Sequence, residues 1–260
     1  MQNSERQQPV TDYALEARGI SKSFVGFFAV KDVDLKIRRG SVHALIGPNG
    51  AGKTTCFNML TKALQPTTGQ IFLEGRDISR LPTSDVARLG LVRSFQISAT
   101  FPHLTCLENV RVALQSKYGR SFHFWRSLGV LSELNERAMH LLGEVGLSDA
   151  ASLPASDLSY GKKRALEIAT TLALDPSVML LDEPTAGMGH EDIEPITGLI
   201  AKVSKDRTIV IIEHNLSVVS TLSERITVLK QDEVLTEGTY AEVSNDPEVI
   251  TAYMGGVDEL

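Results

Sequence analysis

Residues 42–54 of this 260-residue chain read VHALIGPNGAGKT, and this stretch decides the fold. Val42–Ile46 is a mostly apolar run of strand length, and the residues from Gly52 to about Ala63 have a helical pattern. Between them, residues 47–54 fit G-x-x-x-x-G-K-[ST], in which glycines let backbone N–H groups turn inward around phosphate oxygens. The following helix directs its positive end at the same place. The stretch therefore predicts a phosphate-binding loop.

Two side chains of this loop have specific expected roles. Lys53 would reach the β- and γ-phosphates of a nucleoside triphosphate, and Thr54 would place its hydroxyl on Mg²⁺. The alternative is a glycine-rich turn with an incidental lysine. The strand before the loop and the helix after it disfavour that alternative.

A second motif, VMLLDE at residues 178–183, places two carboxylates directly after an apolar run. A buried parallel strand delivers the residues beyond its carboxyl end to the crevice where α/β sheets bind ligands. Asp182 would hold Mg²⁺, directly or through its waters, and Glu183 would polarise the attacking water as general base. Adjacent carboxylates can also mark a solvated strand end, an interpretation that the phosphate loop disfavours.

A third motif, LSYGKKR at residues 158–164, precedes a helical pattern. Ser159 in the capping position, followed by Gly161, would form a second helix N-terminus that can receive an anion. Taken alone, the segment is more typical of an ordinary helix cap.

Composition narrows the function classes. Lys and Arg number 26 against 32 Asp and Glu, a net charge of −6, which argues against broad non-specific nucleic-acid binding. Cys56 and Cys106 make neither a disulfide framework nor a metal site. The polar N-terminus lacks a secretory pattern, and no apolar run approaches the roughly 18 residues of a membrane span. A soluble intracellular protein is expected.

The pattern along the chain indicates an α/β protein with an insertion. Residues 1–11 are expected to be a disordered lead, and period-two alternation near residues 13–17 and 33–37 predicts antiparallel strands. Residues 101–157 are mainly helical in pattern, with Thr105 and Glu108 at capping-box spacing. Strands and helices then alternate, which predicts a largely parallel sheet covered on both faces.

The order of phosphate loop, Gln96, LSYGKKR, four apolar residues with Asp-Glu, and His214 resembles the nucleotide-binding subunit of ATP-binding cassette (ABC) transporters over about residues 13–255. Four segments make it most similar to the branched-chain amino-acid importer group. These are LSYG at 158–161, AGM at 186–188, IEHN at 212–215 and AYMG at 252–255. The lipopolysaccharide-export ATPases are a close alternative.

The resemblance implies an α/β fold: a P-loop NTPase (RecA-like) core with an antiparallel β subdomain and an inserted α-helical subdomain. The core with its β subdomain would span residues 12–96 and 165–260, and the helical subdomain, with the signature motif, would span 97–164.

The resemblance also implies three sets of site residues. The catalytic set would be Glu183, His214 and Gln96, with His214 hydrogen-bonded to the γ-phosphate and steadying Glu183. The magnesium set would be Thr54, Gln96 and Asp182. The ATP-binding set would be Phe24, whose ring would stack on adenine, and Gly47, Pro48, Asn49, Gly50, Ala51, Gly52, Lys53, Thr54, Thr55, Ser159 and Gly161.

The implied partners follow from how this family works. Two nucleotide-binding subunits, identical or homologous, would meet head to tail, with Ser159 and Gly161 of one facing the γ-phosphate held by Lys53 of the other. Integral membrane permeases would dock near residues 96–107, placing the chain on the cytoplasmic face of the membrane, and a solute-binding protein would complete the system. No nucleic acid is expected: the aromatic and basic segment 121–126 fits packing or groove lining better.

Three positions depart from the family pattern. Lys162 stands where the signature usually has Gln, Gly189 where the following loop has Asp or Asn, and His190 where it has Pro. Two other function classes remain as alternatives. A non-transport ABC ATPase usually has fused cassettes or basic arms, and a simple P-loop kinase or GTPase leaves residues 159–164 unexplained.

Overall fold

The computed structural model describes residues 12–94, 100–117 and 128–254. The expected lead at 1–11, Gln96 and the segment 121–126 lie outside these ranges.

The larger sheet has six strands in the order β10-β9-β3-β8-β7-β6. All of its neighbours pair in parallel except β10, which pairs antiparallel with β9. Its strands are β3 (Val42–Ile46), β6 (Leu91–Ser94), β7 (Val178–Asp182), β8 (Thr208–Ile212), β9 (Arg225–Lys230) and β10 (Glu233–Gly238). The predicted parallel sheet is confirmed, with one antiparallel edge strand added.

The smaller sheet has four strands in the order β2-β1-β4-β5 and is antiparallel throughout. Its strands are β1 (Tyr13–Phe24), β2 (Phe27–Arg38), β4 (Thr68–Leu73) and β5 (Arg76–Asp77). Leu15 and Ala17 on β1 pair with Ile37 and Leu35 on β2, and all four are buried. The antiparallel pair predicted from the alternation is therefore confirmed.

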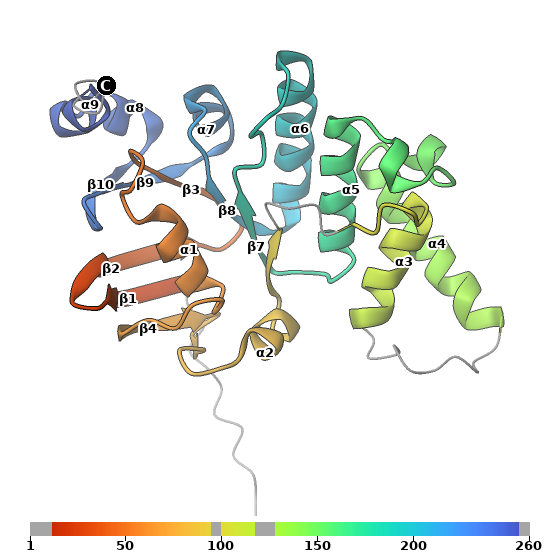
Figure 1. Cartoon of the computed structure of the whole chain (residues 1–260), viewed down its shortest axis with the longest axis horizontal. Helices are drawn as coiled ribbons and strands as arrows, with labels where there is room; N and C mark the ends of the chain where they lie inside the picture. The colour runs from red at the N-terminus through yellow and green to blue at the C-terminus, as the bar shows by residue number, and fades with distance from the viewer. Residues whose placement is uncertain (1–11, 95–99, 118–127, 255–260) are drawn as a thin grey trace, which may run out of the picture.

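Helices cover both faces of the larger sheet, and Figure 1 shows α3 and α4 on the side of the molecule opposite the smaller sheet. The α-helices are α1 (Lys53–Leu60), α2 (Thr83–Arg88), α3 (Cys106–Lys117), α4 (Leu128–Glu144), α5 (Tyr160–Leu172), α6 (His190–Val203), α7 (Leu216–Leu222), α8 (Tyr240–Ser244) and α9 (Pro247–Met254). Short 3₁₀ helices are η1 (Ser148–Ala150), η2 (Ala155–Asp157) and η3 (Ser204–Asp206).

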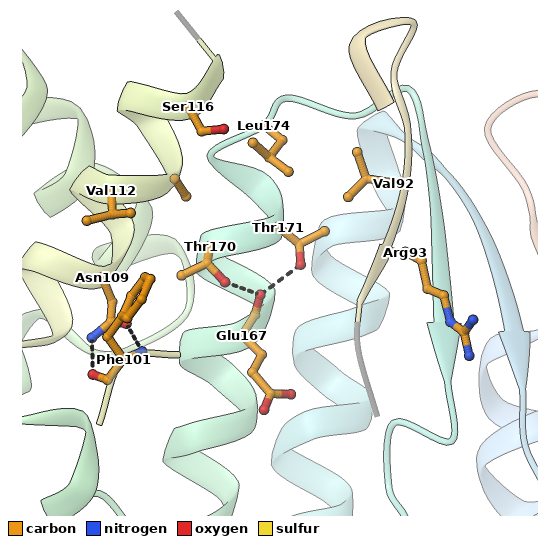
Figure 2. Close-up of a pocket in the computed structure, with 11 residues that line it drawn as sticks. Val92, Arg93, Phe101, Asn109, Val112, Ser116, Glu167, Thr170, Thr171 and Leu174 are labelled. Carbon is orange, nitrogen blue, oxygen red and sulfur yellow. Dashed lines mark hydrogen bonds between the residues drawn. The ribbon is translucent and has the colours of Figure 1, made fainter. Parts of the chain in front are cut away.

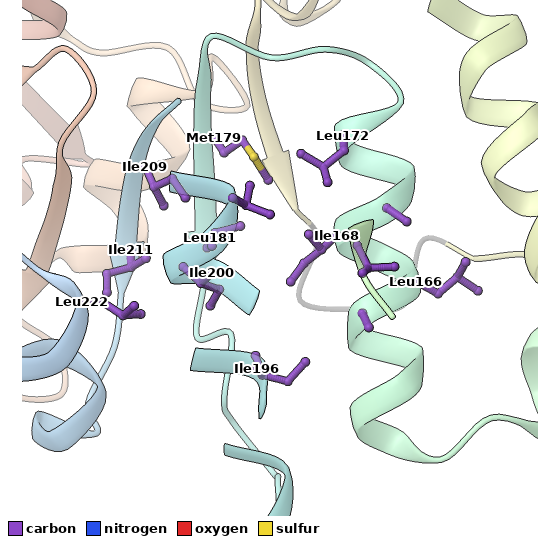
Figure 3. Close-up of a cluster of buried hydrophobic side chains, with 14 of the residues drawn as sticks. Leu166, Ile168, Leu172, Met179, Leu181, Ile196, Ile200, Ile209, Ile211 and Leu222 are labelled. Carbon is purple, nitrogen blue, oxygen red and sulfur yellow. The ribbon is translucent and has the colours of Figure 1, made fainter. Parts of the chain in front are cut away.

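Alternation along β7 divides the apolar interior between the two faces of the sheet. Met179 and Leu181 belong to a cluster with residues of α5 and α6, such as Ile168 and Ile200, which Figure 3 shows between the helices and the sheet. Val178 and Leu180 belong to the cluster on the other face, with α1 and the smaller sheet. Because both faces are buried, β7 is apolar along its length, and its first polar residue is Asp182 at the carboxyl end.

The capping box predicted at Thr105 and Glu108 is present at the start of α3. Glu108 accepts a hydrogen bond from the Thr105 backbone at 2.8 Å, and the Thr105 hydroxyl accepts one from the Glu108 backbone at 3.2 Å. Asp246 accepts from the Glu248 backbone at 2.8 Å, which supports the first turn of α9. In the part of the chain that the structure describes, no helix is long and apolar enough to cross a membrane.

His43 is a buried titratable side chain inside the larger sheet. It lies on β3, is 2% exposed, and its Nε2 lies 2.8 Å from the Thr227 hydroxyl on β9. Burial, reinforced by Arg225 and opposed by Glu237, lowers the pKa of His43 to about 4. Since the unfolded imidazole takes up a proton near pH 6.5 and the folded one near pH 4, stability falls as the pH falls through this window.

We therefore expect the free energy of unfolding to be lower at pH 5 than at pH 7.5, with about 2 kcal/mol of the difference due to His43. Urea unfolding at both pH values measures it. The variant His43→Gln isolates the effect, because it should lose that share of the pH dependence. Equal pH dependence in both proteins would assign the effect to other groups.

Candidate active site

The phosphate loop, the two carboxylates after β7 and His214 lie together at the carboxyl edge of the larger sheet, because its parallel strands end there together. The phosphate loop follows β3, Asp182 and Glu183 stand at the end of β7, and His214 follows β8. These strands are neighbours in the sheet, in the order β3-β8-β7. The crevice beyond the carboxyl ends of such strands is where open α/β sheets bind ligands.

Two glycines of the phosphate loop are required by close backbone approaches. Gly47 has φ 148°, and a Cβ there would lie 2.2 Å from the carbonyl oxygen of Leu229 on β9. Gly52 has φ 87°, and its Cβ would lie 2.5 Å from the carbonyl oxygen of Ala29 on β2. Gly50 has φ 79°, and a Cβ there would meet no atom within 4 Å, so this residue borders open space. The loop is thus fixed to both sheets at its ends and open in its middle.

Lys53 directs its ammonium group back over the loop. Its Nζ donates to the carbonyl oxygens of Gly47 at 2.7 Å and Pro48 at 2.8 Å. Burial lowers the pKa of Lys53, and the nearby Glu183 carboxylate opposes that shift. A cation fixed at the start of α1 reinforces the positive end of that helix, so the loop favours an anion.

A cavity of about 270 Å³ opens over the loop. Its lining comprises loop and helix residues together with Glu183, Phe27 and Asp232. Phe24, the residue expected to stack on adenine, does not belong to this lining. Phe24 pairs directly with Phe27 across the β1–β2 hairpin, so both rings lie on the same face of the sheet, with Phe27 bordering the cavity.

The two carboxylates at the end of β7 occupy different environments. Asp182 is 2% exposed, and its Oδ2 forms an ion pair with Arg93 of β6. Glu183 has φ 44°, an uncommon value for a residue with a side chain, and this conformation leaves about one third of its side chain exposed beside the cavity. The backbone turn therefore separates a buried carboxylate from one that can meet solvent.

The side chain of Arg164 on α5 binds the backbone of residues 182–184, which we call the acidic turn. Its guanidinium donates to the carbonyl oxygens of Asp182 at 2.9 Å, Glu183 at 3.1 Å and Pro184 at 3.1 Å. The same group forms a 2.6 Å ion pair with Glu167 one turn along the helix. Planar guanidinium donors suit such a multiple contact. The sequence placed Arg164 at the end of the third motif without assigning it this role.

Glu213 is a second positioning residue that the sequence reasoning missed. It is 1% exposed and accepts hydrogen bonds from the backbones of Thr185 at 3.1 Å and His214 at 2.9 Å. It thereby ties the acidic turn to the segment carrying His214. The His214 Nδ1 lies 4.0 Å from the Glu183 Oε1, and its side chain is 66% exposed. The two expected catalytic side chains are therefore adjacent.

Ser159 and Gly161 of the third motif do not line this cavity within one chain. Ser159 is the N-cap residue of α5, but its side chain makes no capping hydrogen bond, and it is exposed. Gly161 is buried, with the Asp192 carboxylate where a Cβ would project. The Tyr160 hydroxyl donates to the Ala186 carbonyl oxygen at 3.0 Å. The N-terminus of α5 is thus already formed in the single chain, and the Ser159 hydroxyl has no hydrogen-bond partner among the described residues.

Within the described ranges, no group of three or more His, Cys, Asp or Glu side chains is arranged to hold a metal. Mg²⁺ is typically bound through one or two carboxylates plus substrate phosphates. Thr54 lines the cavity over the phosphate loop, and Asp182, the carboxylate expected to bind the metal, lies at the end of β7.

A second cavity, of about 210 Å³, lies between α3, α5 and β6. Figure 2 shows Val112 on α3 and Val92 on β6 on its two sides, with Glu167, Thr170 and Thr171 of α5 between them. Phe101 is 54% exposed, and its backbone is fixed by Asn109, which donates to its carbonyl oxygen at 3.1 Å. We call this cavity the α3–α5 groove. It includes part of the 96–107 segment expected to meet the permeases.

Comparison with known proteins identifies the class. The family model described as "ABC transporter" matches residues 30–186, and the chain belongs to this family. It is an ATP-binding subunit with the ATPase activity of ABC cassettes. A second model, described as "Branched-chain amino acid ATP-binding cassette transporter", matches residues 233–259.

Individual relatives match over nearly the whole chain. The high-affinity branched-chain amino acid transport ATP-binding protein BraF of Pseudomonas aeruginosa is 39% identical over 93% of this chain and 97% of its own length. The corresponding LivG of Salmonella typhimurium is 40% identical with the same coverage. Among solved structures, an ABC transporter cassette in its ADP conformation matches with a TM-score of 0.83 and 28% identity, over 94% of this chain and 100% of that one.

The contacts of Arg164 generate a first test of the site. Arg164→Met would remove a hydrogen-bond donor from three carbonyl oxygens of the acidic turn, so Glu183 would be held less firmly in position. We expect kcat for ATP hydrolysis to fall by about tenfold or more while the Kd for ATP changes by less than about threefold. Arg137→Met, an exposed change of the same kind on α4, serves as control. An unchanged kcat would remove Arg164 from the positioning set.

Proposed function

We propose that this chain is the ATP-binding subunit of an importer for branched-chain amino acids or related small molecules. The observation that carries the proposal is the match to both family models together with 39–40% identity to amino-acid transport subunits over 93% of the chain. The match at residues 233–259 favours this group over the lipopolysaccharide-export ATPases and over non-transport ABC ATPases. A solute-binding protein would deliver the substrate.

In this proposal the phosphate loop and Lys53 hold the nucleotide through its phosphates. Thr54, Asp182 and Gln96 would hold Mg²⁺, which would neutralise charge on the phosphate oxygens when bound. Glu183, exposed beside the cavity, accepts the proton of the attacking water as general base. His214, with its Nδ1 4.0 Å from Glu183, orients that carboxylate and hydrogen-bonds the γ-phosphate.

The proposed working unit is a dimer of two such subunits. Ser159 and Gly161 lie at the N-terminus of α5, away from the chain's own cavity, and the Ser159 hydroxyl is free to meet a ligand held by a partner. A second subunit placed head to tail would bring this cap to the open side of the γ-phosphate. Closure would exclude water, which strengthens every electrostatic contact in the site. A solved ABC cassette 27% identical to this chain is a dimer bound to ADP and Pi.

The proposed membrane contact is the α3–α5 groove, where a cytoplasmic segment of the permeases would dock. Its lining is mainly apolar and small side chains, with the exposed Phe101 ring beside it. Occupancy there would place the chain at the cytoplasmic face of the membrane. The division into a core with its β subdomain (12–96 and 165–260) and a helical subdomain (97–164) is part of the same proposal.

The catalytic assignment is tested by Glu183→Gln. Removing the general base while keeping the shape of the side chain should lower the rate of ATP hydrolysis by about 100-fold or more. ATP-dependent dimerisation, followed by size-exclusion chromatography with and without ATP, should remain. Glu248→Gln on α9 is the matched control, since that side chain is exposed and far along the chain from the site. Hydrolysis at the parent rate would show that another group is the base.

The docking assignment is tested by Val112→Arg. A long cation in the α3–α5 groove should prevent a permease segment from entering, so the chain should no longer sediment with native membranes. ATP hydrolysis by the purified chain should be unchanged, because Val112 does not border the nucleotide cavity. Ser220→Arg, exposed on α7, is the control. Retained sedimentation of the Val112 variant would place the docking surface elsewhere.

A further inference from the structure

Arg93 lies on β6 at the border of the α3–α5 groove, as does its neighbour Val92. Figure 2 shows the Val92 side chain directed into the groove and the Arg93 side chain directed away from it. Successive side chains of a strand point to opposite faces, so this arrangement follows from the strand itself. The guanidinium therefore lies on the α1 face of the sheet, beside the nucleotide site.

The guanidinium is held there by three different contacts. It pairs with the Oδ2 of Asp182, donates to the Asn58 side chain of α1, and lies 5.4 Å from the centroid of the Phe57 ring. Its side chain is 16% exposed, whereas that of Asp182 is 3% exposed. Asn58 and Phe57 belong to the helix that begins at Lys53, so the arginine is fixed by the phosphate-loop helix itself.

The pair places a positive charge on the carboxylate expected to hold the metal. A buried carboxylate without a partner is strongly disfavoured, and Arg93 supplies the compensating charge. A divalent cation at Asp182 would supply the same compensation and would be repelled by the arginine. The Arg93 Nε has no hydrogen-bond partner among the described residues, so the guanidinium is incompletely satisfied in this position.

We propose that Arg93 is the resident counter-charge of Asp182, which substitutes for Mg²⁺ when the metal is absent and gives up that role when Mg²⁺ arrives with the nucleotide. This inference rests on the proposed function of the site. It assigns a role to a positioning residue outside the motifs.

The proposal makes a sign-specific prediction for nucleotide binding. Without Arg93, the uncompensated Asp182 repels nucleotide phosphates unless Mg²⁺ is present. The ratio of the Kd for TNP-ATP in EDTA to the Kd in excess MgCl₂ should therefore rise by about tenfold in Arg93→Met. Arg93→Lys keeps the charge and should keep a ratio close to that of the parent. A role limited to orienting Asp182 for the metal predicts the opposite, a ratio that falls.

Two further variants keep the test decisive. Asn58→Ala removes the amide that directs Arg93 toward Asp182 without changing any charge, so it should raise the ratio by a smaller factor, even if Arg93→Met fails to fold. Arg88→Met on α2 removes an exposed arginine and should leave the ratio unchanged. An unchanged or lower ratio in both Arg93→Met and Asn58→Ala overturns the inference. Failure of the parent chain to bind TNP-ATP at all would instead overturn the proposed function.

Discussion

The constraint on which the site depends is the concentration of negative charge at the buried end of β7. Asp182 is almost wholly enclosed, and Glu183 adds a second carboxylate beside it. Taking a carboxylate out of water is costly unless it is paired and hydrogen-bonded. Three cations offset this cost. Arg93 pairs with the side chain of Asp182, Arg164 donates to the backbone carbonyl groups, and Lys53 lies near Glu183 across the cavity.

Each of these cations comes from a different element, and this explains why the fold needs its layers. Lys53 begins α1 on one face of the sheet, Arg164 lies in α5 on the other, and Arg93 lies in the neighbouring strand. The two apolar clusters fix these elements against the sheet. The site is therefore a surface feature whose accuracy depends on packing on both faces.

Much of this could be predicted from the sequence because the signals are local. The phosphate loop, the apolar run before Asp182 and the capping box at Thr105 each specify structure through neighbouring residues, and the structure confirms the strand, helix or cap they predict. The roles of Arg93, Glu213 and Phe27 could not be found in this way. Arg93 meets Asp182 across 89 positions of sequence, and only the pairing of β6 with β7 brings the two together. β10 was missed because its polar residues leave an edge strand without an apolar pattern.

Helix α5 concentrates several contacts in one rigid body. Its first turn carries the exposed cap at Ser159, its second turn carries Arg164 on the acidic turn, and Glu167 beyond it borders the α3–α5 groove. At a rise of about 1.5 Å per residue, these three residues lie within roughly 12 Å of one another along the helix axis. A rotation or tilt that alters one of them must alter the others. Substitutions at these three positions are therefore expected to be correlated among related sequences, because a change tolerated at one position has to be compatible with the geometry at the other two.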